Sequence, residues 1–104
     1  MISMNYSSLF QKIKESCLRG ESGDIDTVMG ILAKADLPTT KAVDRYLGSV
    51  NNPDGIRQLE YYLFSGTQIQ RNYSTLFFAR RDEWHLVNRA YAEGLIDWLQ
   101  AYSR

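Results

Sequence analysis

The stretch GDIDTVMGILAKAD, residues 23–36, carries the pattern that decides the fold class. Its apolar residues recur at positions i, i+3, i+4 and i+7, the spacing of one face of an α-helix: Ile25, Val28, Met29 and Leu32. Asp24 precedes the first of them, where its side chain can cap the helix N-terminus. The stretch therefore predicts an amphipathic helix with one buried face.

The same helical spacing recurs along the rest of the chain. Apolar stripes run through residues 9–17, 43–50, 56–63 and 84–91, and no segment alternates apolar and polar residues over the length of a strand. Length also limits the architecture, because 104 residues suffice for one ordinary domain but not for two. We therefore predict one all-α domain, residues 1–104, with about six to seven short helices arranged as three stacked helical hairpins.

Breaks between the stripes predict where helices begin and end. Pro38 is expected to end the second helix, and Ser74 to cap a short fifth helix. Asp82 is expected in a tight turn, and Asp97 at the cap of a last helix. Leu32, Leu63 and Val87 are expected in the core, as is Cys17 on the first stripe.

An internal similarity accompanies these helices. The second helix of each predicted hairpin shares an apolar pattern, beginning at Val28, Leu59 and Val87, at a spacing of roughly 30 residues. NYSSLF at residues 5–10 also nearly matches NYSTLF at residues 72–77. Residues 74–79, STLFFA, resemble the T-P-L-H-x-A opening of ankyrin repeats. Over about half its length the chain thus resembles ankyrin-like or related αα-hairpin repeat proteins, which implies a stack of helix pairs that presents a binding surface.

Charge and cysteine content exclude several classes of function. Twelve basic residues balance twelve acidic ones, so a general electrostatic attraction to nucleic acid or to an anionic membrane is not supported. One cysteine allows neither an internal disulfide nor a multi-cysteine zinc site, and it suits a reducing compartment. No signal peptide and no long apolar run is visible. We expect a cytoplasmic protein with no cofactor and no bound metal.

The charged segment RRDEWH, residues 80–85, contains the only histidine of the chain. Arg80, four further residues and His85 are similar to the arginine–histidine motif of HEPN-type ribonucleases. That resemblance implies His85 as general acid or base and Arg80 as the group that stabilises charge on the phosphate. The segment departs from that family's motif in two ways. Arg81 follows the first arginine, where the family has a polar Asn, Asp or His, and a helix break is expected at Asp82. An exposed turn is the simpler interpretation of the segment.

Arginine and aromatic residues gather in the second half of the chain and predict a surface for another protein. Most of these aromatics have core spacing, whereas Tyr61 lies opposite the apolar stripe of its helix and is expected to be exposed. Arg, Tyr and Trp dominate interface hot spots. The predicted partner-binding residues are Arg57, Tyr61, Arg71, Arg80, Arg81 and Trp84.

The favoured function is a non-enzymatic interaction module: an adaptor, an inhibitor or an immunity-like protein. The sequence leaves two alternatives open, the HEPN-like ribonuclease and a nucleic-acid-binding regulator that uses Arg57, Arg71, Arg80 and Arg81. The last predicted helix carries Trp98, Leu99 and Tyr102 close to the end of the sequence. We expect this apolar helix either to fold back onto the hairpins or to form a homodimer.

Overall fold

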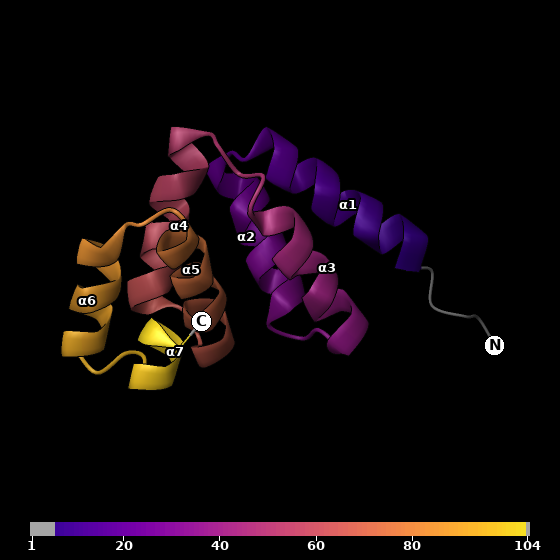
Figure 1. Cartoon of the computed structure of the whole chain (residues 1–104). Coiled ribbons are helices and arrows are strands. Elements are labelled where there is room, and N and C mark those ends of the chain that lie inside the picture. Colours follow the sequence, from indigo (N-terminus) through magenta and orange to yellow (C-terminus); the bar gives the residue numbers. More distant parts are fainter. Residues whose placement is uncertain (1–5, 104) are drawn as a thin grey trace. The chain divides into compact units, whose positions relative to one another are not determined.

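The computed structural model describes residues 6–103, and every regular element among them is an α-helix (Figure 1). The seven helices in this range are α1 (Tyr6–Arg19), α2 (Ser22–Leu32), α3 (Leu37–Leu47), α4 (Pro53–Ser65), α5 (Gln68–Arg80), α6 (Trp84–Ala92) and α7 (Trp98–Tyr102). The predicted all-α fold of about six to seven short helices is confirmed. The helices form two compact units that divide between Ile56 and Arg57, inside α4. The single domain spanning residues 1–104 stays a prediction.

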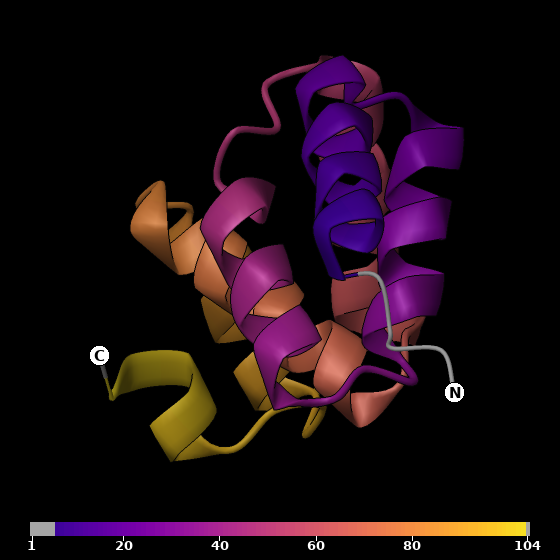
Figure 2. The same ribbon diagram turned by 90° about the vertical axis from the view of Figure 1, so that its right-hand side faces the viewer.

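In the N-terminal unit, α1 packs against both α2 and α3, and α2 also contacts α3 (Figure 2). Each helix supplies one apolar face to the core. The fully buried side chains in this core include Ile13, Cys17, Val28, Leu32 and Val43. The predicted burial of Leu32 and Cys17 is confirmed.

A close backbone approach ties the start of α4 to the turn between α1 and α2. Gly20 takes a positive φ of 64° as α1 ends, and its carbonyl faces Gly55 so closely that a Cβ on Gly55 would lie 2.0 Å from that oxygen. Two hydrogen bonds join the same segments. The Ser22 N–H donates to the Asp54 carboxylate at 2.8 Å, and the Asn52 side chain donates to the Arg19 carbonyl at 3.2 Å. Glycine is required at position 55 because the nearest neighbouring atoms belong to the backbone.

Pro38 lies in the first turn of α3, so the expectation that it ends the preceding helix is wrong. Proline suits a first turn because its missing N–H would have no partner there. Asp36 caps this helix by accepting a hydrogen bond from the Thr39 N–H at 3.0 Å. The same carboxylate accepts from the Tyr6 hydroxyl, and these hydrogen bonds lower the pKa of Asp36, while the Tyr6–Asp36 bond raises the pKa of Tyr6.

Ser74 does not cap α5, contrary to the sequence-based expectation. Thr67 and Gln70 form a capping box, in which each side chain accepts from the other's backbone N–H, and the helix therefore begins at Gln68. Ser74 is fully buried within α5, and its hydroxyl lacks a hydrogen-bond partner among the described residues. NYSTLF thus lies inside α5, whereas the described part of NYSSLF opens α1. The two copies occupy different positions in their helices, and the ankyrin-like repeat stays a prediction.

In the C-terminal unit, α5 packs against α6 and α7, and α6 also contacts α7 (Figure 1). Leu63 and Val87 are fully buried, as predicted. The predicted turn at Asp82 is also present, with a positive φ of 60°. Asp97 caps α7 as expected, accepting from the Gln100 N–H at 2.8 Å. The last helix therefore folds back onto α5 and α6.

Candidate interaction surface

The charged segment that follows α5 forms a tight turn at one end of the C-terminal unit. α5 ends at Arg80, Asp82 adopts the left-handed conformation, and α6 begins at Trp84. The Arg81 guanidinium lies over the Phe77 ring, 4.4 Å from its centre. A cation in this position is attracted to the ring face, so the Arg81 head group remains at the surface while the ring orients it.

An exposed aromatic cluster surrounds Tyr102 of α7. The Tyr102 ring stacks on Trp84 at 6.4 Å and 23°, and it meets Trp98 at 6.0 Å and the edge of Tyr91 at 5.5 Å. Its hydroxyl donates to the Asn88 side chain at 2.6 Å. These contacts hold Tyr102 against α6 and place the three other rings around it.

The outer rings of this cluster remain accessible to solvent. Trp98 is 56% exposed, Tyr91 40% and Trp84 38%. Leu99, which follows Trp98 on α7, is 64% exposed. Large apolar side chains are usually buried, so several of them side by side at a surface indicate an interaction site.

A groove of about 680 Å³ adjoins the cluster. It runs between the end of α5, the following turn and α7, and its lining residues are Leu76, Ala79, Arg80, Asp82, Trp84, Tyr102 and Ser103. Arg80 and Trp84 were both predicted as partner-binding residues. Tyr102 was not, because it reaches the groove from α7 and only folding brings it beside Arg80. Leu76 was not predicted either, although it precedes Arg80 by four residues on α5 and shares its helix face.

Arg71 has a different environment from the other predicted arginines. Its guanidinium donates to the carbonyls of Leu95 at 2.8 Å and Gly66 at 2.7 Å, and to the Gln68 side chain at 3.0 Å. These bonds join the N-terminal end of α5 to the loop that precedes α7. Arg71 is half-buried and has three donors engaged within the fold, so it stabilises the C-terminal unit and does not contribute to the groove.

Arg57 and Tyr61 lie on α4 and are not among the residues that line the groove. With Glu60 and Phe64 they line a separate shallow depression of about 400 Å³. Tyr61 is 54% exposed, as expected from its position opposite the apolar stripe. The Arg89 guanidinium covers the Phe64 ring at 3.9 Å from its centre. This contact resembles that of Arg81 with Phe77, which also places an arginine over an aromatic ring in the C-terminal unit.

His85 is strongly exposed, with 73% of its side chain accessible. Its Nδ1 lies 3.5 Å from the Glu83 carboxylate, and it does not line the groove. The segment between Arg80 and His85 contains a helix end, a turn and a helix start. The break expected from the sequence is therefore present. Within residues 6–103, no group of three or more His, Cys, Asp or Glu side chains is arranged to hold a metal ion.

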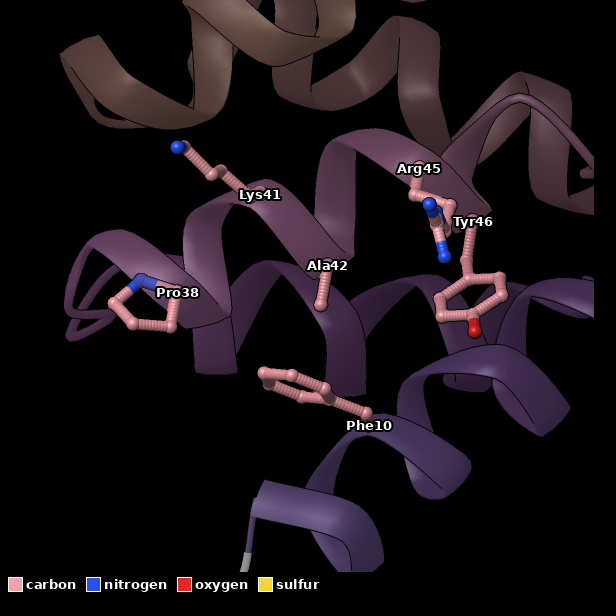
Figure 3. A pocket seen from close by; sticks show the side chains of 6 residues that line it. All are labelled: Phe10, Pro38, Lys41, Ala42, Arg45 and Tyr46. Atoms are coloured by element: carbon pink, nitrogen blue, oxygen red, sulfur yellow. The ribbon is translucent and has the colours of Figure 1, made fainter.

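A second, smaller pocket lies between α1 and α3 in the N-terminal unit (Figure 3). Its volume is about 260 Å³, and it is lined by Phe10, Pro38, Lys41, Ala42, Arg45 and Tyr46. The Phe10 ring points from α1 toward Ala42, with Pro38 on one side and Tyr46 on the other (Figure 3). None of the residues predicted as partner-binding belongs to this pocket.

No protein-family model matches the chain, and it has no match among curated proteins or solved structures. In the described part of the chain, no helix combines the length and apolar character needed to cross a membrane.

Proposed function

We propose that this protein is a small interaction module, an adaptor, inhibitor or immunity-like protein, that binds another protein through the groove and aromatic cluster of its C-terminal unit. The observation that carries the proposal is the convergence of Arg80, Trp84 and Tyr102 on one groove. Tryptophan, tyrosine and arginine are the residue types most enriched among interface hot spots. The three outer rings of the cluster are already held in place by Tyr102, so little conformational freedom is lost when a partner binds.

The chemistry of the groove favours a partner that is acidic and apolar together. Arg80 lines the groove, and the next residue, Arg81, lies over the Phe77 ring; Asp82 is the one acidic residue of the lining, and Leu76 and Trp84 supply apolar contact. We expect a carboxylate of the partner near the arginines and an apolar side chain against the tryptophan. Binding should weaken as salt rises, because exposed charges are screened over about 8–10 Å near physiological ionic strength.

A cytoplasmic location belongs to the same proposal. The free thiol of Cys17 is buried, which suits a protein that needs no disulfide. The ribonuclease using Arg80 and His85 and the nucleic-acid regulator remain alternatives. The first of them has less support, since His85 lies outside the groove that Arg80 lines and pairs with Glu83.

The test compares three variants as bait for partner capture from the cells that make the protein, with mass spectrometry. A partner of the groove is retained by the wild type and by His85→Ala, and is lost with Arg80→Glu combined with Arg81→Glu, and with Trp84→Ala. Far-UV circular dichroism of each variant verifies the fold, and titration calorimetry with the purified partner measures the affinity.

Two results would count against this function. If His85→Ala abolishes an RNA-cleaving activity that the double arginine variant retains, the ribonuclease is the better explanation. If light scattering shows a concentration-dependent dimer that Leu99→Glu makes monomeric, the exposed face of α7 binds a second copy, as the sequence suggested. The groove would then need a separate demonstration of a partner.

A further inference from the structure

We infer that the pocket between α1 and α3 is a second binding site, which takes an apolar side chain of an acidic peptide segment. This site is distinct from the groove of the C-terminal unit, and its residues have no part in the function proposed above.

The inner surface of the pocket is apolar. Phe10 reaches across from α1 toward Ala42, and Pro38 closes the pocket at the start of α3 (Figure 3). Phe10 is only half-buried, although Ile13 and Cys17 farther along α1 are fully buried. An aromatic face that stays partly uncovered gains by contact with another apolar side chain.

Two cations border this apolar surface. Lys41 and Arg45 are separated by one helical turn of α3, so their positive charges repel each other. Both side chains are exposed to solvent. The Arg45 guanidinium lies beside Tyr46, whereas Lys41 extends from α3 away from the Phe10 ring (Figure 3).

Charge complementarity favours acidic residues in the peptide that flank the bound apolar side chain. Arginine is suited to a carboxylate because its planar guanidinium donates two parallel hydrogen bonds. We therefore assign the main anion contact to Arg45, with Lys41 as a mobile second charge at the edge. A bound carboxylate also removes the repulsion between the two cations.

The size of the pocket favours a single side chain over a small-molecule ligand. Its volume of about 260 Å³ is below the roughly 300–1,000 Å³ typical of small-molecule sites. One aromatic or branched side chain fills such a space, while the flanking residues of its peptide lie along α3. The expected sequence of the ligand is an apolar residue with Asp or Glu on either side.

The test uses three synthetic pentapeptides with blocked ends and two-dimensional amide NMR of the full chain. The first is Glu-Glu-Phe-Glu-Glu, the second replaces every Glu by Gln, and the third replaces Phe by Ala. The acidic phenylalanine peptide should shift the amide signals of Phe10 and of residues 41–46 in a saturable manner. The other two should bind at least about tenfold more weakly, since each lacks one of the two contacts.

Variants of exposed residues test which charge is responsible. Arg45→Gln should weaken the acidic peptide about tenfold, and Lys41→Gln should weaken it less. Lys34→Gln is the matched control, because Lys34 is an exposed cation of the same unit that does not line the pocket. It should leave binding unchanged.

Three outcomes would overturn the inference. The glutamine peptide binding as tightly as the acidic one would show that the charges have no role. Inorganic phosphate shifting the same amides with equal affinity would identify a general anion site without side-chain selectivity. Shifts confined to the C-terminal unit would mean that acidic peptides use the groove only, a result that supports the function proposed above and removes this second site.

Discussion

Replacing Gly55 with alanine tests the closest backbone contact in the N-terminal unit. A Cβ at this position would lie 2.0 Å from the Gly20 carbonyl oxygen, 2.9 Å from its carbon and 3.2 Å from the Ile25 side chain. The first two atoms belong to the backbone, so no rotamer change relieves the clash. The start of α4 would have to move away from the α1–α2 turn, and this movement would strain the hydrogen bonds from Ser22 to Asp54 and from Asn52 to Arg19.

The expected loss of stability follows from three contributions. Inserting a group into packed structure costs about 1–3 kcal/mol. Losing both hydrogen bonds adds about 0.5–1.5 kcal/mol for each. Alanine regains about 1 kcal/mol as a better helix former than glycine. Gly55→Ala should therefore lower the free energy of unfolding by about 1–5 kcal/mol, since the costs of about 2–6 kcal/mol exceed that gain.

Gly30→Ala is the matched control, and it should change the free energy of unfolding in the opposite direction. Gly30 lies inside α2, where an added Cβ would meet nothing within 4 Å, so alanine fits there without a clash. It should stabilise the protein by about 0.4–1 kcal/mol, because it restricts the unfolded chain and favours the helix. The same chemical change is thus predicted to destabilise at one site and stabilise at the other.

Urea unfolding followed by two probes measures both effects. Far-UV circular dichroism reports on all the helices, whereas Trp84 and Trp98, the only two tryptophans, report on the C-terminal unit. Coincident transitions would support the predicted single domain, and separate ones would show two independent folding units. A Gly55→Ala protein as stable as the wild type would refute the close-approach argument, as would a Gly30→Ala protein that loses stability.

Three further predictions concern individual side chains. Leu63→Ala should cost about 2–5 kcal/mol because Leu63 is fully buried, whereas Leu18→Ala, at a leucine 62% exposed, should change stability by less than about 0.5 kcal/mol in the same urea assay. Thr67→Ala should cost about 0.5–2 kcal/mol by removing the cap of α5, and Thr67→Ser, which keeps the hydroxyl, should restore most of it. Burial raises the pKa of the Cys17 thiol from 9.0 to about 12, so a thiol reagent should label the folded protein only as it unfolds. Rapid labelling of the native protein at neutral pH would contradict the burial of this thiol. Because the pKa of Cys17 is higher in the folded protein than in the unfolded one, its contribution to stability should be present at neutral pH and be lost as pH rises from 9.0 toward about 12.

Much of the local structure could be predicted from the chain because its causes are local. The apolar stripes identify helices since side chains three and four residues apart share a face, and the same stripes place Leu32, Leu63 and Val87 in the core. The turn at Asp82 and the cap at Asp97 were predicted from equally local signals. Errors arose where two local signals competed.

Helix boundaries show this competition. Ser74 has the chemistry of a cap, but Thr67 and Gln70 form the complete capping box, and the helix begins there. Pro38 breaks a helix interior yet fits a first turn, so its position relative to the Asp36 cap decides its effect. A residue type alone does not distinguish these cases.

The candidate site is only partly visible in the sequence. Arg80 and Trp84 share a segment and were singled out together, whereas Tyr102 reaches the groove from α7, a separate helix. Arg71 looks like the other arginines of the second half until folding brings the Leu95 carbonyl to its guanidinium.

The amino-acid sequence by itself determined that the described chain is helical, which faces of its helices are buried and where several of its turns lie. Only the tertiary structure decided which side chains meet, at the Tyr102 cluster, at the pocket beside Arg45 and at the contact between Gly20 and Gly55. The physical reason is the distance along the chain over which each effect acts. Periodicity and capping act over three or four residues, but convergence depends on how whole helices pack, which no single stretch of sequence specifies.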